Sequence, residues 1–366
     1  MSDFSAQIRL FIEQKPERSE DCRPILRAYP NGSGLLAVFD GAGGAGGTSY
    51  TNAEGESFTG AFLASRLGKK TLLDFFDELL QQSYSFASDT TPKQLEELFK
   101  TNFKTELAGL QTGAISKIKS SLIRYLPTTM AAIYYEKAAD VQPDNGFSAW
   151  QNVAGFFSSE KQPSSLKCNV LWAGDSRCYL LTESSGLQQL TEDDLKTKGD
   201  ALANLIEDSP MSNFISADVD FVLNHRQFEV NTPAVLMAAT DGCFNFVASP
   251  AHFEFMLLKT LHFAENAEQW QADLTEEIKE ITGDDATMSL IALGWQNFNE
   301  IKRAFHARLF EIRKTYISPL GHLNDEVGWL EGRLHLQREE RRRLREKLWH
   351  EYKQKYEFLL IDGGQK

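Results

Sequence analysis

The sequence predicts an α+β protein, with a large acidic domain and a separate helical region at the C-terminal end of its 366 residues. Short apolar runs of strand length recur over residues 1–295, and the helical segments come in groups between them rather than alternating regularly with strands. Composition then changes, because residues 296–366 hold 15 Lys/Arg against 11 Asp/Glu, a net charge of +4, whereas residues 1–295 carry −17. These observations favour α+β over a doubly wound parallel sheet and place the domain boundary at 295/296.

The expected elements follow from apolar spacing and from turn residues. The expected strands are 8–12, 24–29, 35–39, 129–135, 166–172, 178–182, 188–190, 221–230, 233–239 and 287–293, and the expected helices are 58–80, 92–123 and 251–281. The glycine-rich run 41–47 breaks regular structure. Segment 137–165 is rich in Ser, Gln, Asn, Gly and Pro, so we expect an insertion in a hairpin there.

Residues 296–366 are expected to form a helical extension with one apolar stripe. The stripe consists of Leu323, Val327, Leu330, Leu334, Leu344 and Leu348 in heptad-like spacing, and Gln337 and Arg341 interrupt it. Three interpretations stay open. The stripe packs against the large domain, or it binds a protein partner or a second copy of the chain as an interaction arm. In the third, the charged run 338–345 binds nucleic acid or an anionic membrane.

Composition limits the class of protein. No run of 18 apolar residues exists, and the start Met1-Ser2-Asp3-Phe4 lacks the features of a signal peptide, so we expect neither a membrane span nor secretion. The four cysteines show no CxxC pairing, which argues against a structural zinc site and fits a reducing cytoplasm. The acidic large domain argues against nucleic-acid binding and favours cationic substrates or partners.

Acidic residues stand where the expected strands end or begin. Asp40 and Asp241 each follow an apolar run, Asp284 comes just before one, and Glu20 and Asp21 form a further pair. Asp-Gly pairs are common turn dipeptides, but a strand end can also hold a side chain in a fixed position open to solvent. Carboxylates gathered from distant segments repel one another unless a cation lies among them, and oxygen ligands select hard cations such as Mg²⁺ or Mn²⁺. The pattern therefore predicts an acidic metal centre.

The order of these segments resembles the metal-dependent protein phosphatase family, type 2C (PPM). The resemblance covers roughly residues 20–293 and stops near Gly294. The matching segments are Ser19-Glu20-Asp21, Phe39-Asp40-Gly41-Ala42-Gly43-Gly44, Pro127-Thr128-Thr129, Ala173-Gly174-Asp175-Ser176-Arg177, Leu190-Thr191-Glu192-Asp193-Asp194, Thr240-Asp241-Gly242 and Asp284-Asp285-Ala286-Thr287. Each segment is weak alone, and their shared order makes the resemblance specific.

The resemblance implies a central β-sandwich of two antiparallel sheets flanked by helices (α-β-β-α). It also implies hydrolysis of phosphoserine and phosphothreonine in proteins by a water or hydroxide that bridges two Mn²⁺ or Mg²⁺ ions. The implied metal ligands are Glu20, Asp21, Asp40, the Gly41 carbonyl, Asp241 and Asp284, and the implied catalytic residues are Asp40 and Asp241. Phosphorylated proteins are the implied substrates, and a serine/threonine kinase is the implied opposing enzyme.

The chain departs from the family pattern in places. The position of an arginine that contacts phosphate in many relatives is Pro16, so Arg18, at a different spacing, is the candidate for substrate binding. Ala42 stands where eukaryotic members often have histidine, so no imidazole general acid is available there. Segment 121–126 holds no acid, so a third metal is not expected.

Other polar residues near the expected metal ligands are expected to have structural roles. Gly174 to Arg177 is expected to form a tight turn in which Asp175 pairs with Arg177, and a contact from Arg177 to phosphate is the alternative. Asp193 and Asp194 are expected to flank the site, and Asp285 is expected to support it or to form a turn.

Other functions stay open beside the phosphatase hypothesis. A catalytically silent phosphatase fold could act as a scaffold or sensor through its C-terminal arm, because fold does not guarantee function. Hydrolysis of a small phosphorylated metabolite is a further alternative. A nucleotide-binding loop at Gly41–Gly47 is disfavoured because the run lacks the Lys-Ser/Thr of a P-loop and the GxGxxG spacing.

Overall fold

The structure is a computed structural model that describes residues 5–51, 55–82, 86–112, 124–138, 165–197, 199–206 and 209–358. The chain divides into two compact units, Met1–Leu309 and Phe310–Lys366. Most of the insertion expected at 137–165 lies outside the described residues.

The first sheet of the large unit has the strand order β1-β13-β12-β9-β10, with every neighbouring pair antiparallel. Its strands are β1 (Ser5–Ile12), β9 (Arg177–Thr182), β10 (Gly186–Gln189), β12 (Ala234–Ala239) and β13 (Ala286–Leu293). β12 and β13 are buried along almost their whole length, which explains their nearly continuous apolar sequences. β1 lies at the edge, where buried residues alternate with more accessible ones.

The second sheet has the order β11-β8-β7-β3-β2 and is also antiparallel. Its strands are β2 (Ile25–Ala28), β3 (Gly34–Val38), β7 (Met130–Lys137), β8 (Ser165–Ala173) and β11 (Asn224–Asn231). A third, small sheet has the order β5-β4-β6 and consists of β4 (Ser49–Thr51), β5 (Ser57–Thr59) and β6 (Gln111–Thr112).

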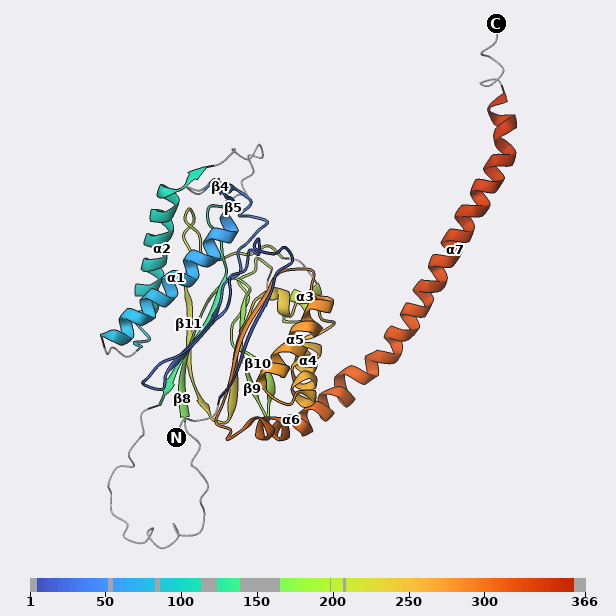
Figure 1. Cartoon of the computed structure of the whole chain (residues 1–366). Helices are drawn as coiled ribbons and strands as arrows, with labels where there is room; N and C mark the ends of the chain where they lie inside the picture. The colour runs from blue at the N-terminus through green and yellow to red at the C-terminus, as the bar shows by residue number, and fades with distance from the viewer. Residues whose placement is uncertain are drawn as a thin grey trace. The chain divides into compact units, whose positions relative to one another are not determined.

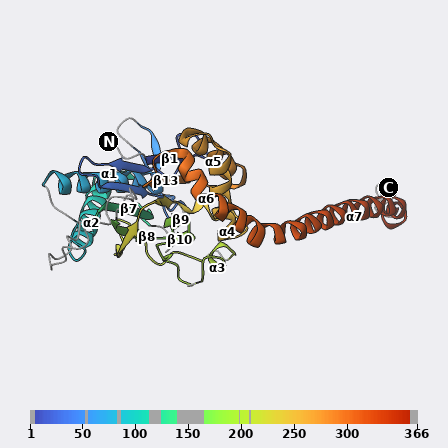
Figure 2. The same cartoon turned by 90° about the horizontal axis from the view of Figure 1, so that it is seen from below.

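Helices cover both outer faces of the sandwich. α1 (Gly60–Gln81) and α2 (Thr91–Gly109) pack on the second sheet, and α4 (Pro250–Phe263) and α5 (Ala267–Ile281) pack on the first (Figures 1 and 2). Phe76, Phe99 and Phe103 fill the core beneath the first pair, and Trp270 lies in the core beneath the second. The order of layers confirms the expected α-β-β-α sandwich.

A third core lies between the two sheets. It brings together small and branched apolar side chains from the inner faces, among them Val38, Ile133, Val170 and Leu236. Because both sheets contribute to it, this core fixes the ends of the strands relative to one another.

Several element boundaries differ from the sequence expectation. The helix expected at 92–123 ends at Gly109, and Gln111 and Thr112 form β6, which pairs with β4. The helix expected at 251–281 is two helices, because Asn266 caps the second with its side chain, which accepts a hydrogen bond from the Gln269 amide.

The helical region begins within the large unit. α6 (Phe298–Ile312) buries Phe298, Ile301 and Phe305 in the same core as α4 and α5, so the boundary between units falls after Leu309 rather than at the expected 295. A short π-helical turn (Arg313–Ile317) and α7 (Ser318–Tyr356) follow. Among the described residues, no helix has both the length and the apolar content needed to cross a membrane.

Candidate active site

The acids expected at the site stand at neighbouring strand ends. Asp40 follows β3, and Asp241 begins a short 3₁₀ turn directly after β12. Asp284 precedes β13, while Glu20 and Asp21 lie in the loop between β1 and β2. β1 ends where β13 begins, because Ile12 pairs with Ala286. The two sheets therefore deliver these acids to one end of the sandwich.

Hydrogen bonds connect the loops that carry the acids. The buried Asp21 accepts a hydrogen bond at Oδ2 from Thr240 Oγ1 at 2.9 Å, which joins the β1–β2 loop to the end of β12. The Asp285 carboxylate accepts from the Glu20 amide at 2.8 Å and from the Gln14 amide at 2.7 Å. Asp285 thus holds the loop in place, in agreement with the supporting part expected for it.

Two glycines allow the loops to approach closely. A Cβ at Gly41 would lie 2.4 Å from the carbonyl oxygen of Ala61, and a Cβ at Gly242 would lie 1.9 Å from the carbonyl oxygen of Asp285. Both obstacles are backbone atoms that cannot rotate away. The glycine after each aspartate is therefore required by packing at the site, beyond its general suitability for turns.

The acids form a cluster of mutually repelling carboxyl groups. Burial, and then the negative charges of Asp21, Asp241 and Asp175, raise the pKa of Asp40 well above its ordinary value. Burial raises the pKa of Asp21 to about 7, and hydrogen bonds from Thr287, Asp40 and Thr240 partly oppose this effect. Burial, followed by the charge of Asp284, raises the pKa of Asp241 to about 6. A cluster with this electrostatics either retains protons near neutral pH or needs a cation.

Asp175 belongs to this cluster, although the sequence led us to expect a structural turn. Burial and the charge of Asp241 raise its pKa to about 8. The expected pairing of Asp175 with Arg177 is wrong, because Arg177 forms a two-pronged ion pair with Asp193, at 2.8 and 2.6 Å. The Arg177–Asp193 pair is almost completely buried. Asp175 follows the apolar strand β8, the same strand-end signal that singled out Asp40.

Asp193 and Asp194 support the site from its flank. Asp193 is occupied by Arg177, and Asp194 accepts hydrogen bonds from the Gly174 amide at 3.0 Å and from Asn213 at 2.7 Å. Both acids thereby hold the turn that presents Asp175, in agreement with their expected flanking position.

A cavity of about 570 Å³ opens beside Glu20 and Asp284. Lys15 and Arg18 line it, together with the aromatic rings of Phe58 and Phe62. The Arg18 guanidinium donates to the carbonyl oxygen of Ser57 and lies over the Phe58 ring, 5.4 Å from its centroid. Arg18 therefore borders the acidic site, which is compatible with the substrate contact expected for it.

Glu20 faces this cavity and is held by a neighbour. Thr59 Oγ1 donates to Glu20 Oε1 at 2.8 Å. Burial raises the pKa of Glu20, while the Thr59 hydrogen bond opposes that effect and the charges of Asp285 and Asp284 add to it.

The donor set fits a hard divalent cation in chemistry and charge. Asp21 Oδ1 and Asp175 Oδ1 are buried and accept no hydrogen bond from the described residues. A buried carboxylate oxygen without a donor is costly unless a cation compensates it. Across the described residues, however, no three His, Cys, Asp or Glu side chains are arranged to hold one metal ion together. Two carboxylate oxygens of the cluster thus lack a hydrogen-bond donor, and the acids do not converge on a single point.

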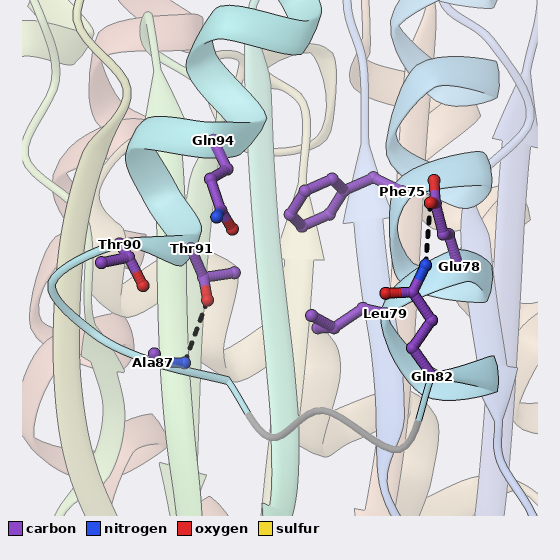
Figure 3. A pocket seen from close by; sticks show the side chains of 8 residues that line it. All are labelled: Phe75, Glu78, Leu79, Gln82, Ala87, Thr90, Thr91 and Gln94. Carbon is purple, nitrogen blue, oxygen red and sulfur yellow. Dashed lines mark hydrogen bonds between the residues drawn. The ribbon is translucent and has the colours of Figure 1, made fainter.

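A second hollow, of about 420 Å³, lies between the end of α1 and the start of α2 (Figure 3). Its polar groups bond one another: Gln82 donates to Glu78 at 2.9 Å, and Thr91 Oγ1 accepts from the Ala87 amide at 3.0 Å. None of the acids expected at the site lines it. The acidic cluster is therefore the better candidate for an active site.

The fold is similar to that of solved bacterial phosphatases. The serine/threonine phosphatase Stp1 from Staphylococcus aureus matches with a TM-score of 0.51 at 13% identity, over 81% of this chain and 96% of that one. A mutant form of a bacterial serine phosphatase matches with a TM-score of 0.50 at 13% identity, over 80% of this chain and 98% of that one. Neither a protein-family model nor a curated protein sequence matches the chain. These two structural matches show that the large unit shares its fold with bacterial serine/threonine phosphatases.

Proposed function

We propose that the chain is a metal-dependent phosphatase that hydrolyses phosphoserine and phosphothreonine in proteins. The observation that carries the proposal is the cluster of Asp21, Asp40, Asp175 and Asp241. They come from the β1–β2 loop and from the ends of β3, β8 and β12, and their pKa values are raised. The phosphatase fold and the ordered family motifs support the same activity. Arg177 forms its ion pair with Asp193, and its charge only partly opposes the raised pKa values of Asp175 and Asp241.

The residues that would hold two Mn²⁺ or Mg²⁺ ions are Glu20, Asp21, Asp40, the Gly41 carbonyl, Asp241 and Asp284, to which we add Asp175. Bound divalent ions supply a hydroxide near neutral pH and neutralise charge on a phosphoryl group. Asp40 and Asp241 are the proposed catalytic residues, since they have the central positions in the cluster. The Thr240 hydroxyl orients Asp21 by donating a hydrogen bond to its carboxylate. The Asp285 carboxylate orients Glu20 by accepting a hydrogen bond from the backbone amide of Glu20.

The cavity beside the cluster would receive the phosphorylated residue. Lys15 and Arg18 line it on the side of Glu20 and Asp284, so their positive charges could contact the phosphate and offset the negative field of the acids. Phe58 and Phe62, whose rings stack with centroids 4.6 Å apart, offer an apolar wall for the peptide next to the phosphate. We propose Arg18 as a substrate-binding residue on these grounds.

The proposal places the enzyme in the cytoplasm, opposite a serine/threonine kinase. All four cysteines are free and buried, which suits a reducing compartment.

Hydrolysis of a phosphothreonine peptide, with Mn²⁺ and with chelator, tests the function. Asp40→Asn should lower kcat/KM by roughly 10²–10³-fold, the usual cost of losing one preorganised charge in an active site. Asp74→Asn is the matched control, because Asp74 is an exposed acid on α1. Calorimetric titration with Mn²⁺ should show weaker binding by the Asp40 variant than by the control.

Full activity in Asp40→Asn would overturn the proposed site. Absence of turnover with any divalent metal would instead favour the silent scaffold or sensor. A small phosphorylated metabolite hydrolysed faster than the peptide would keep the chemistry and change the substrate class.

A further inference from the structure

α7 carries a stripe of apolar side chains that the structure leaves open to solvent. It is the stripe expected from the sequence with Leu320 added at its start. Its members are between 47% and 58% exposed: Leu320, Leu323, Val327, Leu330, Leu334, Leu344 and Leu348. Its members alternate at spacings of three and four residues, and Gln337 and Arg341 occupy the two polar positions within it. From the first to the last leucine the stripe is about 42 Å long, at 1.5 Å per helical residue. The stripe therefore has the length and spacing of a coiled-coil seam of four heptads.

The sequence of α7 makes it a poor helix without a partner. Gly321, Gly328 and Gly332 lie in its interior, where glycine is among the least favourable residues. A Cβ at any of the three would meet no atom within 4 Å, so packing in the described part of the chain does not require glycine there. Helices in proteins gain most of their stability from packing an apolar face. The exposed stripe is the face available for that packing.

We propose that α7 pairs with α7 of a second copy of this chain, in a parallel two-stranded coiled coil. Leucine fills three d positions, Leu323, Leu330 and Leu344. The intervening a positions are mainly aliphatic, which is a pattern compatible with two-stranded coils. This interaction is independent of the proposed phosphatase activity.

The uneven distribution of the apolar layers selects the parallel alignment. Five apolar layers precede Gln337 and two follow Arg341, so only in-register parallel helices bring every apolar layer against an identical one. An antiparallel pair that sets Gln337 against Arg341 would place Val327 against Glu351 and Leu323 against Lys355, burying charges against apolar residues. In the parallel pair Gln337 meets Gln337 and Arg341 meets Arg341. The two arginines repel each other, so these polar layers fix the register at a cost in stability.

Charged residues beside the seam partly favour and partly oppose the parallel pair. The favourable contact lies at the polar gap. In the parallel pair, Glu340 at a g position faces Arg345 of the second copy at an e position. Arg333 and Arg338 are brought together in the same way and repel each other. The apolar layers, rather than the flanking charges, therefore determine the alignment.

Molar mass by light scattering tests the pairing on the full chain. The wild type should have twice the chain mass of 41.2 kDa. Leu334→Lys should weaken the dimer roughly 10²-fold or more, since one layer loses a leucine from each copy. Leu336→Lys is the matched control, because Leu336 is exposed on the same helix but lies off the stripe.

Disulfide trapping tests the alignment. Leu323→Cys should form a covalent dimer under mild oxidation, because parallel in-register helices bring the two d positions within disulfide reach. Asp325→Cys, on the outer side of the same turn, should not cross-link, and the four native cysteines are buried. In an antiparallel pair the two copies of position 323 would be too far apart to bond.

A monomeric wild type overturns the proposal, and then the stripe binds the large unit of its own chain or a different protein. Equal effects of Leu334→Lys and Leu336→Lys also overturn it, because the seam would not be the interface. A dimer in which Leu323→Cys fails to cross-link overturns the parallel alignment.

Discussion

Replacing Asp21 by asparagine should stabilise the metal-free protein at pH 8. Asp21 is 1% exposed. Burial raises the pKa of its carboxyl from 3.8 to about 7, with Asp40 and Asp241 among its neighbours. One pKa unit corresponds to 1.36 kcal/mol, so ionising this group in the folded protein costs roughly 2–4 kcal/mol of unfolding free energy once coupling to its neighbours is allowed for. Asparagine is nearly the same size, carries no charge and can still accept the Thr240 hydrogen bond.

The sign of the pH dependence follows from the raised pKa. Below about pH 4 the carboxyl is protonated in both states, and its full contribution to stability is present. As pH rises from about 4 to 7 the unfolded chain loses this proton first, so the folded state is progressively destabilised. The variant should therefore match the wild type near pH 4 and exceed it by roughly 2–4 kcal/mol at pH 8.

Urea unfolding in chelator at the two pH values measures this difference. Added Mn²⁺ should narrow this difference at pH 8, because an ion that binds only the folded state stabilises it, and the variant has lost one carboxylate that would hold the ion. At about 1,000 times its Kd the ion adds about 4.1 kcal/mol, which is enough to reverse the order. Asp74→Asn should behave like the wild type throughout. A variant that is less stable than the wild type at pH 8 in chelator would refute the reasoning, since the charge of Asp21 would then not be a net cost.

Three further predictions concern the supporting structure. Arg177→Met should destabilise the protein by about 3–5 kcal/mol in urea unfolding, because it leaves Asp193 buried and charged; an Arg177→Met/Asp193→Asn double variant should recover part of the loss, and a single-variant cost below about 1 kcal/mol would contradict a structural pair. Gly242→Ala should cost about 1–3 kcal/mol because its Cβ meets the Asp285 backbone; an unchanged melting temperature would argue against that close approach. The cysteines should resist alkylation at pH 8 until urea unfolds the chain, because all four are buried and burial raises their pKa values, to about 12 for Cys22 and Cys168; labelling of the native protein, followed by mass spectrometry, would contradict this.

Much of the large unit could be predicted from local patterns. Asp40 and Asp241 were recognisable because each follows an apolar run long enough to be a buried strand. The helix expected at 92–123 was predicted too long, because its end depends on the pairing of Gln111 and Thr112 with β4, a segment some sixty residues away. Local spacing contains no information about that pairing.

Some features of the site could likewise be predicted from the sequence, and others depend on the tertiary structure. The sequence indicated which acids stand at strand ends, and it indicated the seam of α7, since a heptad is a property of neighbouring residues. Only the tertiary structure decided that Arg177 pairs with Asp193 rather than Asp175, which leaves Asp175 in the acidic cluster. The raised pKa values of the clustered acids also depend on the tertiary structure. A pKa depends on burial and on charges a few ångströms away, and both are set by segments that lie far apart in the sequence, such as those of Asp40 and Asp241.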